Sequence, residues 1–283
     1  LKDGLAERVL SEGAKSPADV LMTVDFANLV DLAARGVTQA IDSKALTAAV
    51  PANLRDPGHH WFALSLRART LYAAKGGAPQ RFAYEELADP KWKGKVCLRS
   101  GQHPYNNALI AHLIARDGAD KTEAWLRGVK ANLARKPGGG DREIARDIMG
   151  GLCEIGLGNS YYVGLMRSGK GGPEQQKWGE AIDVILPVLA AGDGSHANIS
   201  GAAIARHAPN RQEAVKLLEF LVSDEAQDIY ARANYEYPVK AGVAVDPLIA
   251  ALGALKVDTL PLREIAQYRK LASELVDKVG FDN

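Results

Sequence analysis

The sequence predicts an α/β protein built as two lobes. Helical and extended patterns alternate along most of the chain, which is typical of α/β layers. The chain has 283 residues, more than one hydrophobic core usually supports, so two lobes are expected. Hydrophobic residues make up 47% of the chain and charged residues 24%, a balance that is ordinary for a globular protein and excludes a disordered or fibrous one.

The charge balance excludes two further classes of protein. The 35 basic side chains almost match the 34 acidic ones, which leaves a net charge of +1 and no overall electrostatic footprint for nucleic acid or an anionic membrane. No apolar run approaches the roughly 18–20 residues that a bilayer-spanning helix needs. The sequence therefore predicts neither a nucleic-acid partner nor a transmembrane segment.

Apolar spacing predicts the elements at the start of the chain. Residues 5–10 begin an amphipathic helix, and the apolar run over 20–24 predicts a buried strand. Asp25 stands where the next helix begins, and that helix runs over 26–35 until Gly36 ends it.

The same reasoning predicts alternating elements along the rest of the chain. In α/β folds the loops that follow the strands form the ligand crevice, so residues at strand ends are candidate binding residues. Strands are expected over 61–72, 96–98, 154–157, 184–189 and 199–204, and helices over 107–116, 125–133, 142–149 and 211–231.

Three tyrosines follow predicted strand ends. Tyr161 and Tyr162 are adjacent after one strand, and Tyr105 follows another. A phenolate is a hard, anionic oxygen donor that suits a hard, highly charged cation. Ionising a phenol near pH 7 costs about 4 kcal/mol per ligand, which a trivalent ion offsets more readily than a divalent one. The alternative is that these tyrosines pack in the core with their hydroxyls at its rim.

A second pattern indicates an anion site. Ser100, Gly101, Gln102 and His103 precede a predicted helix, whose first amides have no partner within the helix and favour a small anion such as carbonate, oxalate or phosphate. Arg67 and Arg69 lie two residues apart on one strand, share one face, and would supply a bidentate clamp. The alternative is that both arginines are solvated or form structural ion pairs.

Catalytic motifs find no support in the sequence. No nucleophile elbow is present, and neither Cys97 nor Cys153 stands in a catalytic signature. The segment over 164–171 imitates a phosphate-binding loop, but Gly171 stands where the magnesium-ligating Ser or Thr belongs. The sequence therefore predicts a binding protein and not an enzyme. A hydrolase or transferase on a similar two-lobe scaffold is the least favoured of the functions considered.

These motifs resemble the periplasmic ferric-iron-binding proteins, the solute-binding components of bacterial iron(III) ABC transporters. The resemblance spans nearly the whole chain, and its most specific element is the Asn-x-Tyr-Tyr motif over 159–162 together with Tyr105. Further matching stretches lie over 16–25, 55–69, 87–100, 104–106, 198–230 and 237–239.

The resemblance implies a fold and a site. The fold is the type II periplasmic binding protein-like fold, in which crossing hinge strands join two lobes that close over the ligand. One lobe is expected over 1–64 and 188–238, and the other over 65–187 and 239–283. Fe(III) would be bound by Tyr105, Tyr161 and Tyr162, and a synergistic anion such as carbonate or oxalate by residues 100–103 with Arg67 or Arg69. Asp25 and Asn159 would contact the ligand residues without binding the metal themselves.

The resemblance also implies a cellular compartment and a partner. The protein would be a periplasmic monomer that delivers iron to an inner-membrane ABC permease. The first strand of the family, with a further Tyr or His ligand, is expected to be missing from this chain. An oxidising periplasm would permit a disulfide between Cys97 and Cys153 if their strands are neighbours, the alternative being two buried thiols. The alternative function is a binding protein of the same fold for phosphate, sulfate or a dicarboxylate, without metal.

Overall fold

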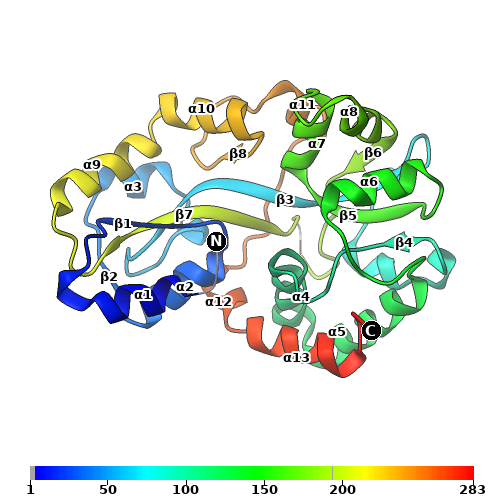
Figure 1. Ribbon diagram of the computed structural model, residues 1–283, viewed down its shortest axis with the longest axis horizontal. Coiled ribbons are helices and arrows are strands. Elements are labelled where there is room, and N and C mark those ends of the chain that lie inside the picture. The colour runs from blue at the N-terminus through cyan, green and yellow to red at the C-terminus, as the bar shows by residue number, and fades with distance from the viewer. Residues whose placement is uncertain (1–3, 193) are drawn as a thin grey trace. The chain divides into compact units, whose positions relative to one another are not determined.

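The structure is a computed structural model that describes residues 4–192 and 194–283 (Figure 1). By its internal contacts the chain divides into two compact units, which are described separately. Unit 1 takes the described residues of Leu1–Leu66, Asn198–Val245 and Leu260–Ala266, and unit 2 takes those of Arg67–Ala197, Asp246–Thr259 and Gln267–Asn283.

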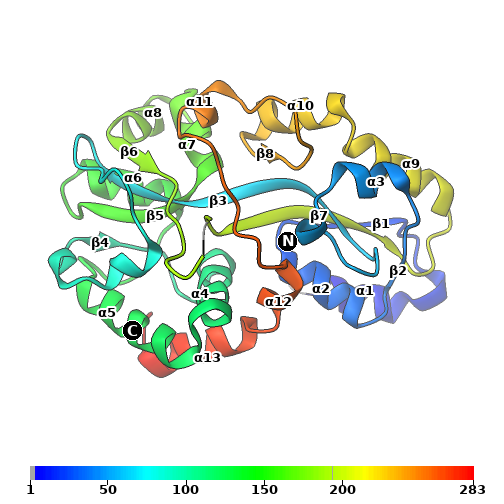
Figure 2. The same cartoon turned by 180° about the vertical axis from the view of Figure 1, so that it is seen from behind.

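Unit 1 is a small antiparallel arrangement of strands with helices. Its elements are α1 (Leu5–Glu12), β1 (Val20–Thr23), α2 (Phe26–Ala34), β2 (Thr38–Gln39), α3 (Lys44–Ala49), the first part of β3 (Phe62–Ala74), β7 (Ala197–Ala205) after its first residue, α9 (Arg211–Leu221), α10 (Asp224–Asn234), β8 (Tyr237–Pro238) and α12 (Leu262–Ala266). Strands β1 and β2 pair with β7, and β8 pairs with β3. Helix α12 packs against α2, so this late segment of the chain returns to unit 1 (Figure 2).

Two predictions for unit 1 need correction. Strand β1 is not fully buried, because Leu21 is 3% exposed and Met22 is 41% exposed, the alternation of a strand with one face toward the core. The long helix predicted over 211–231 is two helices, α9 and α10. The chain breaks at Ser223, whose side chain accepts a hydrogen bond from the amide of Ala226 and so caps a new helix.

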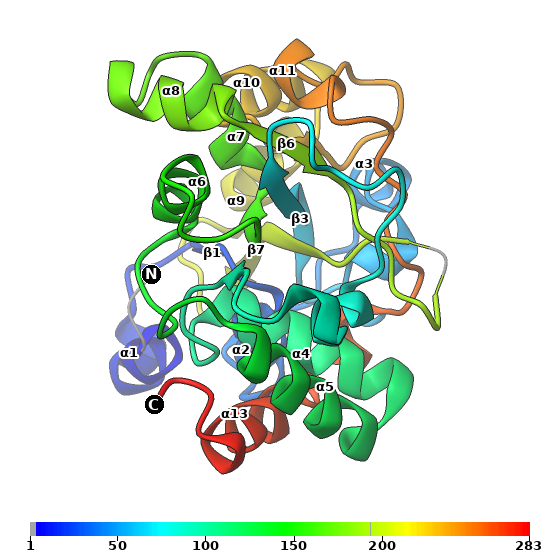
Figure 3. The same cartoon turned by 90° about the vertical axis from the view of Figure 1, so that its right-hand side faces the viewer.

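Unit 2 is built around the second part of β3. It contains β4 (Val96–Cys97), α4 (Pro104–Asp117), α5 (Ala119–Asn132), α6 (Asp141–Met149), β5 (Ile155–Asn159), α7 (Ser160–Arg167), α8 (Pro173–Glu180), β6 (Ile182–Ile185), α11 (Pro247–Ala250) and α13 (Arg269–Val279). Strands β5 and β6 flank β3 on either side as antiparallel neighbours, and β4 continues the sheet parallel to β5. Helix α13 packs against α4 and α5 (Figure 3), and α11 packs against α7.

The disulfide expected between Cys97 and Cys153 is present. Cys97 lies in β4, and its neighbour in the parallel ladder is Gly156 of β5. The link therefore joins the segment that leads to α4 with the segment that leads to α7.

Two strand predictions in unit 2 were inaccurate. The strand expected over 184–189 is β6, which ends at Ile185, before Pro187, a residue that has no amide hydrogen to continue a ladder. Strand β5 extends to Asn159 and needs Gly158, because a Cβ there would lie 2.2 Å from the Tyr72 ring. The close approach lets the Tyr72 hydroxyl donate to the Asn159 carbonyl at 3.0 Å.

The boundaries of the units differ from the division expected from the sequence. Residues 188–197 belong to unit 2, where the amide of Ser195 donates to the carbonyl of Lys256 at 2.8 Å. Residues 260–266 belong to unit 1. Within the described residues, no helix combines the length and the apolar character that crossing a bilayer requires.

Candidate functional site

Tyr105 and the pair Tyr161 and Tyr162 lie at the starts of two helices of unit 2. Helix α4 begins at Pro104, whose fixed φ suits the first helical position, and Tyr105 follows it. Helix α7 begins at Ser160 directly after β5, so the pair takes its second and third positions. The hydroxyl oxygens of Tyr105 and Tyr161 lie 3.3 Å apart, and the ring centroids of Tyr161 and Tyr162 lie 4.1 Å apart. The structure therefore brings the three predicted tyrosines together.

The surroundings of Tyr161 disfavour the ionised form of its phenol. Burial raises the pKa of Tyr161 far above the ordinary phenol value, and Tyr105 and Tyr162 raise it further. Adjacent phenolates repel each other unless a positive charge lies between them. A ligand that ionises these oxygens must therefore supply a large positive charge.

The donor chemistry narrows the choice of ligand. Among residues 4–192 and 194–283, no group of three or more His, Cys, Asp or Glu side chains is placed to hold a metal ion. The converging donors in unit 2 are phenolic oxygens, which are hard when ionised. The arrangement can bind a hard trivalent cation, with three phenolates matching its charge.

Guanidinium groups surround the tyrosines. The Cζ atom of Arg99 lies 5.3 Å from the ring centroid of Tyr105, and that of Arg67 lies 6.0 Å from the same centroid. The Cζ atom of Arg142 lies 5.6 Å from the ring centroid of Tyr162. Cationic groups therefore lie over the rings of two of the three tyrosines.

Arg69 lies in a buried polar network and is a structural residue. Its Nη1 donates to Asp141 Oδ2 at 2.6 Å and to Asn159 Oδ1 at 3.1 Å, and its Nη2 donates to Asn106 Oδ1 at 2.7 Å. Arg99 donates from Nη1 to the other oxygen of Asp141 at 3.1 Å. The structural ion pair weighed as the alternative for Arg69 is therefore present.

Sequence reasoning missed Asp141 and Arg99. Asp141 opens α6 after a glycine-rich turn and is separated from Arg69 by 72 positions, so no local spacing connects the two. Arg99 directly precedes the predicted anion loop. This position next to the loop is a signal in the sequence that could have marked Arg99 as a candidate site residue.

The loop before α4 already holds a carboxylate. Ser100 Oγ donates to Asp282 Oδ2 at 2.6 Å, and the amide of Gly101 donates to Asp282 Oδ1 at 2.8 Å. The amide of Gln102 also donates to Asp282, at 3.3 Å. These donors were expected to be available to an anion from solution, but the C-terminal segment of the chain occupies them. Their binding of a soluble anion stays a prediction.

His103 caps α4 as a neutral side chain. Its Nδ1 accepts from the amide of Tyr105 at 3.2 Å, and its ring meets the Tyr105 ring edge-on at 4.6 Å between centroids. Burial, followed by the nearby charge of Arg99, lowers the pKa of His103 to about 4. A neutral imidazole that accepts at Nδ1 carries its hydrogen on Nε2, so His103 remains a donor at neutral pH.

The two residues predicted to support the ligands lie in different units. Asn159 precedes α7, and its amide donates to Asp141 at 2.8 Å, which links the buried network to the start of that helix. Asp25 belongs to unit 1, where its Oδ1 accepts from the amide of Ala27 at 2.9 Å and caps α2. A supporting role for Asp25 stays a prediction.

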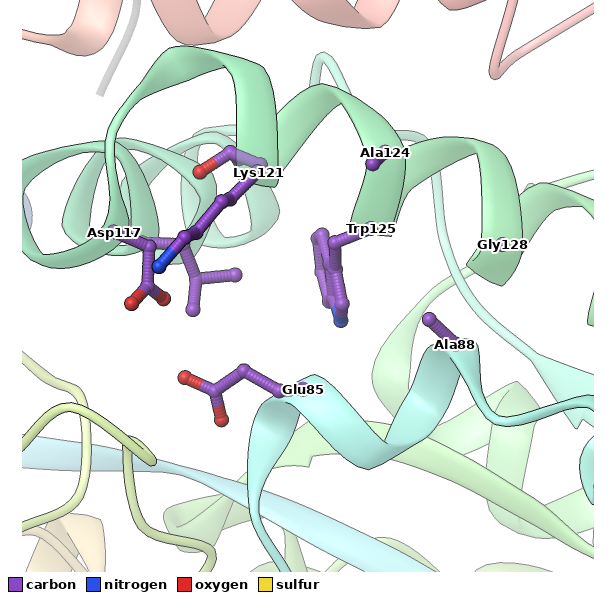
Figure 4. A pocket seen from close by; sticks show the side chains of 9 residues that line it. Glu85, Ala88, Asp117, Lys121, Ala124, Trp125 and Gly128 are labelled. Carbon is purple, nitrogen blue, oxygen red and sulfur yellow. The ribbon is translucent and has the colours of Figure 1, made fainter.

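A cavity of about 400 Å³ lies elsewhere in unit 2, between the turn over Tyr84–Ala88 and α5 (Figure 4). Glu85, Asp117 and Lys121 line one end of it, and Trp125 lies along its wall. None of the predicted site residues lines it, so the tyrosine cluster and this cavity are separate features.

Comparison with known proteins assigns the chain to a family. Residues 15–252 match the family described as bacterial extracellular solute-binding protein. Iron uptake protein A1 of Synechocystis sp. is 41% identical over 281 residues, which cover 99% of this chain and 78% of that relative. The Fe(3+)-binding periplasmic protein of Serratia marcescens is 24% identical and covers 98% of this chain and 80% of its own length.

Solved structures match the fold closely. A Bordetella ferric binding protein superposes with a TM-score of 0.96 at 65% identity, covering 100% of this chain and 90% of its own. A Trichodesmium protein described in complex with iron and citrate ligands superposes with a TM-score of 0.93 at 40% identity, covering 99% of this chain and 88% of its own. The predicted α/β fold of periplasmic binding proteins is confirmed.

Proposed function

The chain belongs to the bacterial extracellular solute-binding protein family, and from this premise we propose that its solute is Fe(III). The ligands are the phenolates of Tyr105, Tyr161 and Tyr162. The observation that carries the proposal is the 3.3 Å separation of the Tyr105 and Tyr161 hydroxyl oxygens, with the Tyr162 ring packed at a tilt against that of Tyr161. Three phenolates balance the charge of a ferric ion, so the loaded cluster is neutral.

An anion completes the coordination in this proposal. Three protein ligands leave positions on a ferric ion for other donors, and guanidinium groups flank the Tyr105 ring. The structure of the Trichodesmium relative, described as holding iron and citrate ligands, supports a carboxylate in this role. Carbonate, oxalate and similar oxyanions are the candidates, held beside Tyr105 with Arg67 nearby.

The cellular role follows from the family. Solute-binding proteins of this kind work with ABC permeases, so the partner is an inner-membrane permease and the compartment is the periplasm, where the Serratia relative is placed by its name. We assign the chain a carrier role as a monomer, and not an enzymatic one, because the tyrosine cluster offers ligands for a cation and no nucleophile paired with a base. Relatives named for iron uptake and ferric iron favour this role over metal-free anion binding.

The test is the visible absorption of the protein loaded with Fe(III). Phenolate bound to Fe(III) gives a charge-transfer band, and we expect that band in the wild type. Tyr161→Phe and Tyr162→Phe should weaken both the band and the affinity, because each removes one anionic ligand. Tyr230→Phe, which changes a tyrosine of α10 in unit 1, is the matched control and should leave both unchanged. An intact band and affinity in the Tyr161→Phe, Tyr162→Phe double variant would show that these residues do not bind the metal.

A further inference from the structure

The cavity between the turn over Tyr84–Ala88 and α5 has walls that are held in place (Figure 4). The indole Nε1 of Trp125 donates to the carbonyl of Tyr84 at 3.0 Å, which holds the ring between the helix and the turn. A Cβ at Gly128 would lie 2.8 Å from that of Ala88, so a larger residue there would push α5 away from the turn. The volume of about 400 Å³ is within the range of small-molecule sites.

The charged groups at one end of this cavity leave a negative excess. Glu85, Asp117 and Lys121 line that end, which gives two carboxylates and one ammonium group. Figure 4 shows the carboxylate of Glu85 extending from the turn toward Asp117 on the opposite wall. Within the part of the chain that the structure describes, none of these three side chains forms an ion pair. A ligand with one positive charge would balance the group.

The carboxylate of Glu85 also lacks a hydrogen-bond donor. Its Oε1 accepts from the amide of Ala190 at 3.0 Å, whereas Oε2 is buried and accepts no hydrogen bond from any described residue. Burial raises the pKa of Glu85, and the charge of Asp117 raises it further. Buried acceptors without donors are rare in proteins and indicate a donor that binds there. A positively charged donor supplies both the missing hydrogen bond and the missing charge.

The rest of the lining is mostly apolar. Leu113, Ala88 and Ala124 contribute aliphatic surface, and Trp125 contributes an aromatic ring. Organic ammonium groups bind favourably over aromatic faces. A metal ion fits less well, because no group of three or more His, Cys, Asp or Glu side chains among the described residues is placed to hold one. The lining therefore favours an amine that carries an apolar body.

We propose that this cavity is a second binding site of the protein, which takes a protonated organic amine with a short apolar body. The ammonium group donates to the carboxylates of Glu85 and Asp117, and the apolar body lies along Trp125. The site is separate from the tyrosine cluster and does not depend on the proposed iron binding.

Calorimetry with benzylamine tests the proposal, because this probe joins one ammonium group to one aromatic ring. Benzyl alcohol replaces the ammonium group by a hydroxyl, and benzoate replaces it by a negative charge. Benzylamine should bind at least about tenfold more tightly than benzyl alcohol, since hydrogen bonds between charged groups are the stronger ones. Benzoate should bind more weakly than either.

Glu85→Gln tests the carboxylate on the turn. The variant keeps an acceptor for the amide of Ala190 and loses the charge, so benzylamine affinity should fall about tenfold. Glu86→Gln is the matched control on the same turn, outside the lining, and should leave the affinity unchanged.

Two further variants test the sign of the charge. Asp117→Asn should weaken benzylamine binding about threefold, and Lys121→Gln should strengthen it by a similar factor, because the lysine repels an ammonium ligand. Asp120→Asn, an exposed change outside the lining, should have no effect. Both cavity variants alter side chains that are not buried, so they decide the question if Glu85→Gln does not fold.

Several results would overturn the proposal. They are the absence of measurable benzylamine binding, equal binding of benzyl alcohol, stronger binding of benzoate, and an unchanged benzylamine affinity in Glu85→Gln or in Asp117→Asn. The iron-binding function is tested separately, because the Tyr161→Phe, Tyr162→Phe double variant should bind benzylamine as the wild type does.

Discussion

The start of α7 is held by the buried network of unit 2, whereas the start of α4 is held both by that network, through Asn106, and by the C-terminal segment. Asn159 ends β5 and bonds Asp141 and Arg69, which are buried, and the disulfide to Cys97 joins the chain just before β5 to β4. At α4, Asn106 accepts from Arg69 at 2.7 Å, but the loop before the helix bonds Asp282, just beyond the end of α13.

This difference shows two ways of positioning the tyrosines that we propose as metal ligands. The pair Tyr161 and Tyr162 follows a strand that cannot shift without disturbing buried ion pairs, so its position is rigid. Tyr105 follows a loop held by hydrogen bonds that are partly exposed, which are individually weaker because water competes for them. We expect the α7 side to resist perturbation and the α4 side to be adjustable.

Removing the carboxylate of Asp141 should have the largest effect. Asp141→Asn leaves two arginines without their shared counter-ion, and breaking a buried ion pair typically costs about 3–5 kcal/mol. Denaturant unfolding measures this loss of stability, and the iron-loaded band should weaken with it. The exposed Asp120→Asn is the matched control and should change stability by less than about 1 kcal/mol. Equal stability of the two variants would show that the network does not anchor α7.

Acid should lower the stability of the protein through a buried histidine pair, one member of which lies on α4. Burial lowers the pKa of His112 below its ordinary value of 6.5, and burial followed by the charge of His112 lowers the pKa of His196 well below it. His112, which lies on α4, contacts His196 at 2.9 Å and Asp258 at 3.1 Å, and Arg116 also donates to Asp258. The pair is therefore neutral in the folded protein.

The sign of the pH effect follows from those shifts. Below about pH 6.5 the unfolded chain binds protons that the folded protein does not, so stability is full above that pH and falls as pH falls toward the lowered values. Each histidine contributes a slope of up to about 1.4 kcal/mol per pH unit. Unfolding experiments between pH 7.5 and 5 should show a shallower slope for His196→Gln than for the wild type, with the exposed His207→Gln as control. Identical slopes of stability against pH in His196→Gln and the wild type would show that the His112–His196 pair does not cause the pH dependence.

The smallest effect on stability is expected from a change in the C-terminal segment, at Asp282. Asp282→Ala removes the acceptor for Ser100 Oγ and for two loop amides that lie near solvent, which should cost about 1–2 kcal/mol of stability. Because Tyr105 follows this loop, iron affinity should fall by up to about tenfold while the two tyrosines on α7 stay in place. Asn283→Ala is the control for a change at the end of the chain. If Asp282→Ala lost more iron affinity than Asp141→Asn, the loop before α4 would matter more for the site than the buried network does.

Local patterns in the sequence were enough for most of the elements and for singling out the three tyrosines that the fold brings together. The spacing at which hydrophobic residues recur indicates which face of a segment is buried. For this reason β3, α2 and α6 were predicted near their observed bounds. The tyrosines stood out because their positions after strands are local facts. Errors came where one residue ended an element, at Ser223 between two helices and at Pro187 after β6.

Tertiary structure alone decided which partners the charged residues have. Arg67 and Arg69 were equivalent in the sequence, and only the contact of Arg69 with Asp141, 72 positions away, made it structural. In the same way Asp282 reaches a loop 182 positions away from it. Hydrogen bonds and ion pairs depend on distances between side chains, which local periodicity does not encode, so the sequence by itself determined the donors and only the fold determined their partners.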